Sequence, residues 1–195
     1  YLLPITRLLA TVLLTAPGTP FVYYGEEVGL AGAKPDERIR TPMQWDAARL
    51  TGGFTTGVPW ERLANGYRAN NVATMQAEPD SLLNHYRALI QLRNAHAALQ
   101  TGTLQLVESG QDGIYSFLRY GEDEAVLVVI NLGRETVTDY ALTVAEGLLP
   151  ASVTAELLYG EGRVTAPQVS AAGGFADYVP LASLAPQSTT IIALR

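Results

Sequence analysis

The sequence of 195 residues contains no cysteine. This absence excludes disulfide bonds, thiolate metal sites and a cysteine nucleophile within these residues, because each of them needs a thiol sulfur. It leaves the compartment open, since proteins from oxidising and reducing compartments both occur without cysteine. The localisation is unknown from the sequence.

Basic residues are also few: 13 lysine and arginine residues stand against 19 acidic ones, the net charge is -6, and Lys34 is the only lysine. No basic stripe could neutralise a phosphate backbone, so we expect no nucleic-acid partner. The longest apolar stretch, Leu8 to Ala16, lies between Arg7 and Pro17 and is far shorter than the ~20 residues of a membrane span. We therefore expect no membrane partner.

What is present is an apolar, foldable chain, with 48% hydrophobic and 16% charged residues. Apolar residues at helical spacing predict a helix over 5–14, and Pro and Gly in 16–20 end it. The run 21–24 (FVYY) is typical of a buried strand of a parallel sheet. Regular patterns then fail over 25–79, and a connection of this length is uncommon unless it carries function. A capped amphipathic pattern predicts a helix over 81–99.

After Gly102 the pattern changes to short β-branched and aromatic runs separated by glycine-containing turns. Several short strands at this spacing predict an antiparallel β-sandwich. We therefore expect two domains, an α/β unit over 1–102 and an all-β unit over 103–195. The predicted strands are 104–107, 114–118, 125–130, 136–142, 154–159 and 189–194.

The α/β unit holds one predicted parallel strand, which needs neighbouring strands on both edges. The chain also begins with Tyr1 instead of methionine. We interpret the chain as a piece of a longer protein whose first 102 residues form the end of a larger domain. A chain of only these residues should expose an apolar face and either self-associate or leave Tyr1 to Tyr24 poorly packed.

Three groups of residues are candidates for chemistry, and two of them are weak. Glu26 and Glu27 follow the predicted strand, but neighbours on an extended segment point to opposite faces and cannot form a catalytic carboxylate pair. One of them could line a site, although pairing with arginine is the favoured role. His85 and His96 lie eleven residues apart on the predicted helix, or roughly 16 Å, so one metal ion cannot bind both and packing roles are favoured.

The third group is the dense run PDERIRTPMQWD, residues 35–46. Arginine can donate to sugar hydroxyls, aspartate can accept from them, and an indole can stack on a sugar ring. An internal salt-bridge knot that pins the long loop, with Trp45 as its core anchor, explains the same residues equally well.

Four ordered blocks in the sequence resemble the alpha-amylase family of glycoside hydrolases, in particular its alpha-amylase, oligo-1,6-glucosidase and trehalose-synthase branch. These blocks are GTPFVYYGEEVGL (18–30), DERIRTPMQWD (36–46), GGFTTGVPW (52–60) and NVATMQAEPDSLLNHYRALIQLRNAH (71–96).

The resemblance implies that the chain is the last αβα portion of a (β/α)8 TIM barrel followed by an antiparallel β-sandwich C-terminal domain. Residues 21–24 would be the eighth barrel strand, 81–99 the eighth helix and 103–195 the sandwich. The parent would be a retaining glycoside hydrolase acting on α-linked glucans such as maltooligosaccharides.

The resemblance also implies site residues. Asp36 and Arg40 match the positions at which related members contact sugar, and they are the substrate-binding candidates. The family's three catalytic carboxylates would precede Tyr1, since the sequence has no Asn-His-Asp motif. No catalytic residue, metal site or cofactor is expected in this chain, any calcium site would lie in the upstream part, and the chain alone is predicted to be inactive.

Two alternatives stay open. The β unit could be a non-catalytic module with a structural or glucan-binding role, and a structural role is favoured because its aromatic residues are scattered singly. Alternatively, the parent could be a transglycosylase or an isomerase such as a trehalose synthase. The scattered aromatic residues are Tyr115, Tyr120, Tyr140, Tyr159, Phe175 and Tyr178.

Overall fold

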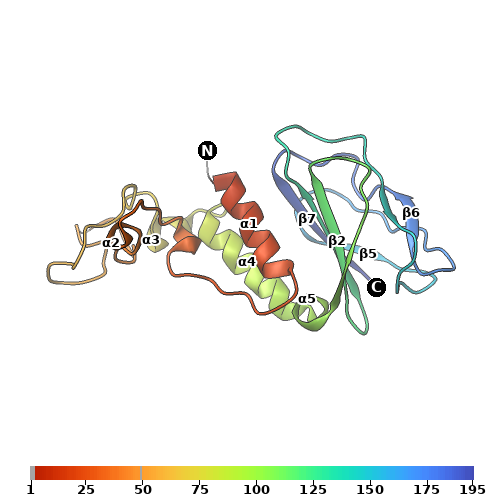
Figure 1. The fold of residues 1–195 in the computed structure, drawn as a ribbon, viewed down its shortest axis with the longest axis horizontal. Coiled ribbons are helices and arrows are strands. Elements are labelled where there is room, and N and C mark those ends of the chain that lie inside the picture. The colour runs from red at the N-terminus through yellow and green to blue at the C-terminus, as the bar shows by residue number, and fades with distance from the viewer. Residues whose placement is uncertain (1–2, 49) are drawn as a thin grey trace. The chain divides into compact units, whose positions relative to one another are not determined.

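The computed structural model describes residues 3–48 and 50–195, and Tyr1, Leu2 and Arg49 lie outside this description. It divides into two compact units: one comprises the residues up to Arg7 and Pro20–Ile90, and the other comprises Leu8–Thr19 and Gln91–Arg195. The helices are α1 (Leu3–Thr15), the short 3₁₀ helix η1 (Glu26–Val28), α2 (Asp36–Ile39), α3 (Val72–Ala77), α4 (Leu82–Ala95) and α5 (Ala97–Thr101) (Figure 1). The strands are β1 (Thr103–Leu106), β2 (Ile114–Tyr120), β3 (Ala125–Asn131), β4 (Leu142–Val144), β5 (Ala155–Tyr159), β6 (Phe175–Tyr178) and β7 (Ser188–Leu194).

The predicted helices are present with changed ends. The helix predicted over 5–14 is α1. The helix predicted over 81–99 is two helices, because His96 takes an extended conformation between α4 and α5 (φ -119°, ψ 107°). The expected cap of α4 is present: the Ser81 hydroxyl accepts a hydrogen bond from the Asn84 N–H at 3.2 Å.

The strand predicted over 21–24 is wrong. These residues have no regular structure, and Phe21 is 85% exposed. A strand is stabilised by hydrogen bonds to neighbouring strands, and no other segment among the described residues pairs with this one. The loop over 25–79 is largely irregular, as predicted, and contains only the short helices η1, α2 and α3.

The β unit is a sandwich of two antiparallel sheets. The larger sheet has the strand order β1-β2-β3-β7-β5, and the smaller one pairs β4 with β6. All six predicted strands overlap observed ones, but 136–142 was expected too early: it shares only Leu142 with β4, and before that residue only Val137 forms a bridge, to Leu184. Strand β6 was not predicted, because Asp177 interrupts the alternation of apolar and polar residues in this short segment. In the structure Asp177 has a φ of +50°.

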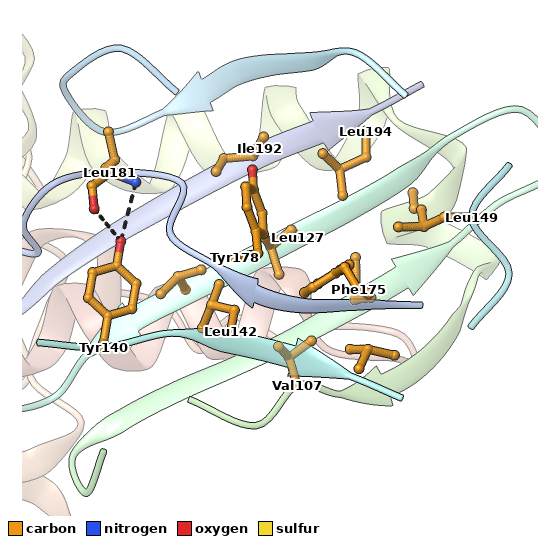
Figure 2. Close-up of a cluster of buried hydrophobic side chains, with 14 of the residues drawn as sticks. Val107, Leu127, Tyr140, Leu142, Leu149, Phe175, Tyr178, Leu181, Ile192 and Leu194 are labelled. Carbon is orange, nitrogen blue, oxygen red and sulfur yellow. Dashed lines mark hydrogen bonds between the residues drawn. The ribbon is translucent and has the colours of Figure 1, made fainter. Parts of the chain in front are cut away.

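The core lies between the two sheets (Figure 2). Side chains from β2, β3 and β7 meet Leu142 and Val144 of β4 and Phe175 and Tyr178 of β6. The hydroxyl of Tyr140 donates a hydrogen bond to the carbonyl oxygen of Leu181 at 2.7 Å and accepts one from its N–H at 3.3 Å. This pair holds the loop before β7 against the core.

The opposite face of the larger sheet is also buried. All seven residues of β3 are buried, although those on the core face alternate with those on the other face. Helix α5 contacts β2 and β3. The Thr11 and Thr189 hydroxyls lie 3.2 Å apart, so α1 residues in this unit also lie against β7. The sheet is therefore covered on both faces within its own unit.

No helix among the described residues is long and apolar enough to cross a membrane.

Candidate functional site

Asp36 and Arg40, the predicted substrate-binding residues, lie together at the surface. Helix α2 begins at Asp36 and ends before Arg40, whose N–H donates to the carbonyl oxygen of Asp36 at 3.1 Å. This single turn places the two side chains side by side, with Arg40 Nη2 3.8 Å from Asp36 Oδ2. Lys34 Nζ lies 2.5 Å from the other carboxylate oxygen, Asp36 Oδ1. The result is a charged group of three residues, Lys34, Asp36 and Arg40.

This charged group is exposed: its side chains are 81%, 50% and 60% accessible for Lys34, Asp36 and Arg40. Ion pairs at such exposure contribute little to stability, because water screens them. The hydrogen-bonding atoms of Arg40 and Asp36 are thus available to a ligand. Sequence reasoning did not single out Lys34, since two residues before an aspartate is not a regular spacing for an ion pair.

The stretch that follows the charged group is its anchor. Thr41, Met43 and Gln44 are buried. The Gln44 side chain donates from Nε2 to the carbonyl oxygen of Asn70 at 2.7 Å, and the main-chain carbonyl oxygen of Gln44 accepts from the Val72 N–H at 3.0 Å. These bonds join the loop to the start of α3.

Trp45 is not the core anchor that an internal knot requires, because half of its surface is exposed. The arrangement differs from that hypothesis: residues 41–44 are buried, whereas the indole of Trp45 and the side chains of Asp36 and Arg40 are exposed. An exposed indole is a suitable surface for a sugar ring.

Tyr24 connects the segment before Gly25 with this loop. Its hydroxyl donates to the carbonyl oxygen of Thr41 at 3.1 Å, and its ring packs on Tyr23 at a centroid distance of 4.9 Å. Partial burial raises the pKa of Tyr24, the neighbouring Tyr23 adds to the rise, and the positive charge of Arg40 opposes it. Arg40 and Tyr24 therefore share one electrostatic environment.

Glu26 and Glu27 both lie on η1, but their side chains are in different environments. Glu26 is exposed, whereas the Oε2 atom of Glu27 is buried and has no hydrogen-bond partner among the described residues. The favoured pairing with arginine is wrong for the part of the chain that is described, since none of its ion pairs includes either residue. Burial raises the pKa of the nearby Tyr86 to about 12, and the charges of Glu26 and Glu27 contribute to the rise.

The two histidines have packing roles, as predicted. His85 is buried, and its Nε2 lies 2.9 Å from the carbonyl oxygen of Arg7. His96 is buried, and its Nδ1 lies 3.0 Å from the Glu124 carboxylate, which fixes the break between α4 and α5. No group of three or more histidine, cysteine or acidic residues that could hold a metal ion occurs within residues 3–48 and 50–195.

The aromatic residues of the sandwich form no exposed strip. Tyr120, Tyr140, Phe175 and Tyr178 are buried, and the last two meet edge to face at 5.2 Å. Burial raises the pKa of the Tyr178 hydroxyl, and the nearby Tyr140 contributes to the rise. These rings act as core residues and offer no stacking surface to a glucan.

Known proteins resemble this chain in sequence. Residues 1–102 match the sequence model of a family described as "Alpha amylase, catalytic domain". The chain is 30% identical over 188 residues to the trehalose-6-phosphate hydrolase of Bacillus subtilis (strain 168), covering 78% of this chain and 33% of that protein. It is 37% identical over 161 residues to the trehalose synthase of Thermus thermophilus, covering 75% of this chain and 16% of that protein.

Solved structures also resemble this chain. The trehalulose synthase of Pseudomonas mesoacidophila MX-45 superposes with a TM-score of 0.72 at 26% identity, covering 99% of this chain and 38% of that one. The chain thus spans about a third of the length of the first curated relatives that it matches.

Proposed function

Because the chain belongs to the alpha-amylase family, we propose that it is the C-terminal part of a retaining glycoside hydrolase that acts on α-linked glucans. The observation that carries the proposal is the match of residues 1–102 to the catalytic domain of that family. The share of each relative that the chain covers, about a third, supports its being one part of a longer enzyme.

Within that enzyme, residues 1–102 would close a (β/α)8 barrel and 103–195 would form the C-terminal β-sandwich. The extent of the family match, which ends at residue 102, supports this division. So does the exposure of Phe21, Val22, Tyr23 and Tyr24, because apolar side chains of a barrel strand are normally covered on both faces. In such a barrel, residues that follow the strands line the site at its C-terminal face.

Asp36 and Arg40 would bind the sugar. The guanidinium is a planar donor of several hydrogen bonds, and the carboxylate accepts from hydroxyl groups. Their exposure and the weak contact of 3.8 Å between them support this role, since neither is committed to a buried partner. They would position the substrate, whereas bond cleavage would use carboxylates outside this chain.

The chain alone would therefore be inactive. Hydrolysis with retention needs a nucleophilic carboxylate and a second one as acid and base, about 5 Å apart. The sequence has no Asn-His-Asp motif, and Glu26 and Glu27 lie on one short helical turn with different burial. We assign no cofactor to these residues, and any calcium would be bound by other parts of the enzyme.

The test is a comparison of the chain with the longer protein that contains it, on maltooligosaccharides and isomaltooligosaccharides. We expect turnover by the longer protein and none by the chain. Turnover by the chain would show a carboxylate pair within these residues, and a longer protein that cleaves no α-glucoside would refute the proposal.

A transglycosylase or isomerase is the second candidate for the parent. It is favoured by the 37% identity to a trehalose synthase and by the superposition on a trehalulose synthase. Incubating the longer protein with maltose or with sucrose and identifying the products by NMR separates the two reactions. Glucose alone from maltose indicates hydrolysis, whereas trehalose, or an isomer of sucrose from sucrose, indicates transfer.

For the β unit we propose a structural role in preference to glucan binding, supported by the burial of Tyr120, Tyr140, Phe175 and Tyr178. Titration of the whole chain with maltoheptaose, followed by NMR shifts, tests this. Saturable shifts confined to residues of 103–195 would support glucan binding instead.

The partner of the longer enzyme would be an α-glucan, and neither nucleic acid nor a membrane is proposed as a partner. The net charge of -6 supports the first exclusion.

A further inference from the structure

The C-terminal end of α1 needs partners that α1 itself does not supply. The last carbonyl groups of a helix accept no hydrogen bond from an N–H within the helix, and they carry a partial negative charge. No basic residue lies in the last turn of α1. In the turn that follows, the carbonyl groups of Ala16 and Gly18 add two more acceptors to those of Leu14 and Thr15.

Arg93, near the end of α4, fills three of these acceptors. Its Nη1 donates to the carbonyl oxygens of Leu14 at 2.9 Å and Ala16 at 3.1 Å, and its Nη2 donates to that of Gly18 at 2.6 Å. The side chain is buried although no acidic residue contacts it among the described ion pairs.

Arg119, near the end of β2, donates to the fourth acceptor. Its Nη1 donates to the carbonyl oxygen of Thr15 at 2.5 Å, while Nε and Nη2 donate to that of Gly102 at 3.3 and 2.9 Å. Arg119 is the largest fully buried side chain of the described residues. It lies on the face of the sheet opposite to its neighbour Leu118, which belongs to the core between the sheets.

Two buried guanidinium groups without a carboxylate are costly unless other groups compensate them. Here the compensation comes from carbonyl dipoles at one helix end, where a positive charge is favourable. Burial lowers the pKa of both arginines, and the charge of Arg93 adds to the effect on Arg119, so the two charges influence each other.

The chain also packs closely at two glycines near Arg119. A side chain on Gly102 would clash with the carbonyl oxygens of Ala98 and Tyr120, and one on Gly121 would come within 3.2 Å of Ala98. Only glycine therefore allows α5 and the strand ends to approach this closely. Together with the contact between Thr11 and Thr189, these positions show helical segments packed against the second face of the sheet.

We propose that Arg93 and Arg119 form a two-arginine clamp that fixes residues 8–19 and 97–102 on the larger sheet. By this clamp the helical segments form a layer against the face of the larger sheet that is opposite to the core between the two sheets. The clamp is independent of the proposed enzymatic activity, since it uses only contacts inside one compact unit.

The test is hydrogen exchange of the whole chain carrying Arg119→Met, with Arg163→Met as control because Arg163 is also in this unit but is exposed. Unfilled buried carbonyl groups destabilise the local structure, so amide exchange in residues 8–19 should rise about tenfold or more. Exchange in β4 and β6, which lie on the other side of the core, should not change. A uniform rise, or no rise in 8–19, would overturn the clamp.

Arg93→Met provides the second measurement, and it decides the question if Arg119→Met does not fold. This variant keeps the bonds of Arg119 to Thr15 and Gly102. We expect faster exchange confined to residues 8–19. Unchanged exchange in residues 8–19 would refute the role of Arg93. Arg119→Lys keeps the positive charge but lacks the planar guanidinium, so exchange equal to that of the parent would refute the role of that group.

Discussion

His85 Nε2 donates a hydrogen bond to the backbone carbonyl oxygen of Arg7, at 2.9 Å and 78 positions earlier in the chain. Since a carbonyl can only accept, the ring is protonated at this nitrogen. Burial lowers the pKa of His85 from 6.5 to about 4, and this hydrogen bond opposes the shift only in part. The imidazole is therefore neutral in the folded chain at neutral pH.

The first prediction is a loss of stability in acid that depends on His85. Between pH 6.5 and about 4 the unfolded chain binds a proton at this residue and the folded chain does not, so the free energy of unfolding falls as the pH is lowered. The contribution is complete above pH 6.5 and amounts to about 1–3 kcal/mol, allowing for partial solvation of the ring. Urea unfolding of the parent and of His85→Gln over this range should give curves that diverge as the pH rises. Parallel curves would contradict the prediction.

The second prediction concerns substrate binding by Arg40 in the longer enzyme. Arg40→Ala removes a charged donor, so KM for oligosaccharides should rise by about tenfold while kcat changes little. Asp36→Asn should have a smaller effect of the same kind. Arg38→Ala is the matched control, since Arg38 is exposed on the same helical turn. Unchanged kinetics for Arg40→Ala would contradict a role in substrate binding. Arg40 would then have only its surface ion pair with Asp36.

The third prediction separates two carboxylates that share Arg195. The Glu124 side chain is 13% exposed and contacts His96 and Arg195, whereas that of Glu156 is 61% exposed and contacts Arg195 alone. Glu124→Gln should lower the free energy of unfolding by about 1–3 kcal/mol, because it weakens a hydrogen bond to a buried ring. Glu156→Gln should cost at most about 0.5 kcal/mol. Chemical denaturation at neutral pH measures both, and equal losses would contradict this ranking.

The fourth prediction tests the hydrogen-bonded pair of Tyr140 and Leu181. Tyr140→Phe leaves the buried N–H and carbonyl groups of Leu181 without this partner and should cost about 1–3 kcal/mol of unfolding free energy. Tyr115→Phe, in the same unit but only half-buried, should cost less than about 0.5 kcal/mol. Thermal and urea unfolding would check both variants, and a stable Tyr140→Phe would show that water replaces the hydroxyl.

The fifth prediction is self-association through the exposed segment 21–24. Phe21 is 85% exposed, and the three residues after it are each more than 40% exposed. Apolar surface of this kind favours association, so sedimentation coefficients of the chain should rise with concentration. Phe21→Ser combined with Tyr23→Ser should weaken the dependence, whereas Val58→Ser, at an exposed position outside this segment, should not. A monomer at all concentrations would refute it.

Much of the fold could be predicted from local patterns. Helix α1 and strands β2, β3 and β7 are long, apolar and bounded by glycine or proline, so periodicity alone identifies them. The segment 21–24 has an equally clear strand pattern, yet strand formation depends on pairing with other segments. Strand β6 was missed for the opposite reason: its four residues carry a weak pattern, and β4 induces the strand by pairing with it.

The candidate site could be predicted only in part. The resemblance singled out Asp36 and Arg40, and the structure brings them together on one turn. It also exposes Trp45, which the sequence could not decide, because an indole next to charges is compatible with the core and with the surface. Arg119 gave no signal at all, since an arginine between apolar residues of a strand normally points to water.

The bonds of Arg93 and Arg119 to main-chain carbonyl groups have an evolutionary consequence. A carbonyl group is the same in nearly every amino acid, so substitutions at positions 14, 15, 16 and 18 leave the acceptors in place. The two arginines therefore require no particular side chain at these positions, where burial constrains Leu14 and Thr15 and a φ of +95° constrains Gly18. Statistical coupling between columns of an alignment would detect no pair here, and a contact map inferred from covariation would lack the contacts that join this helix end to the sheet.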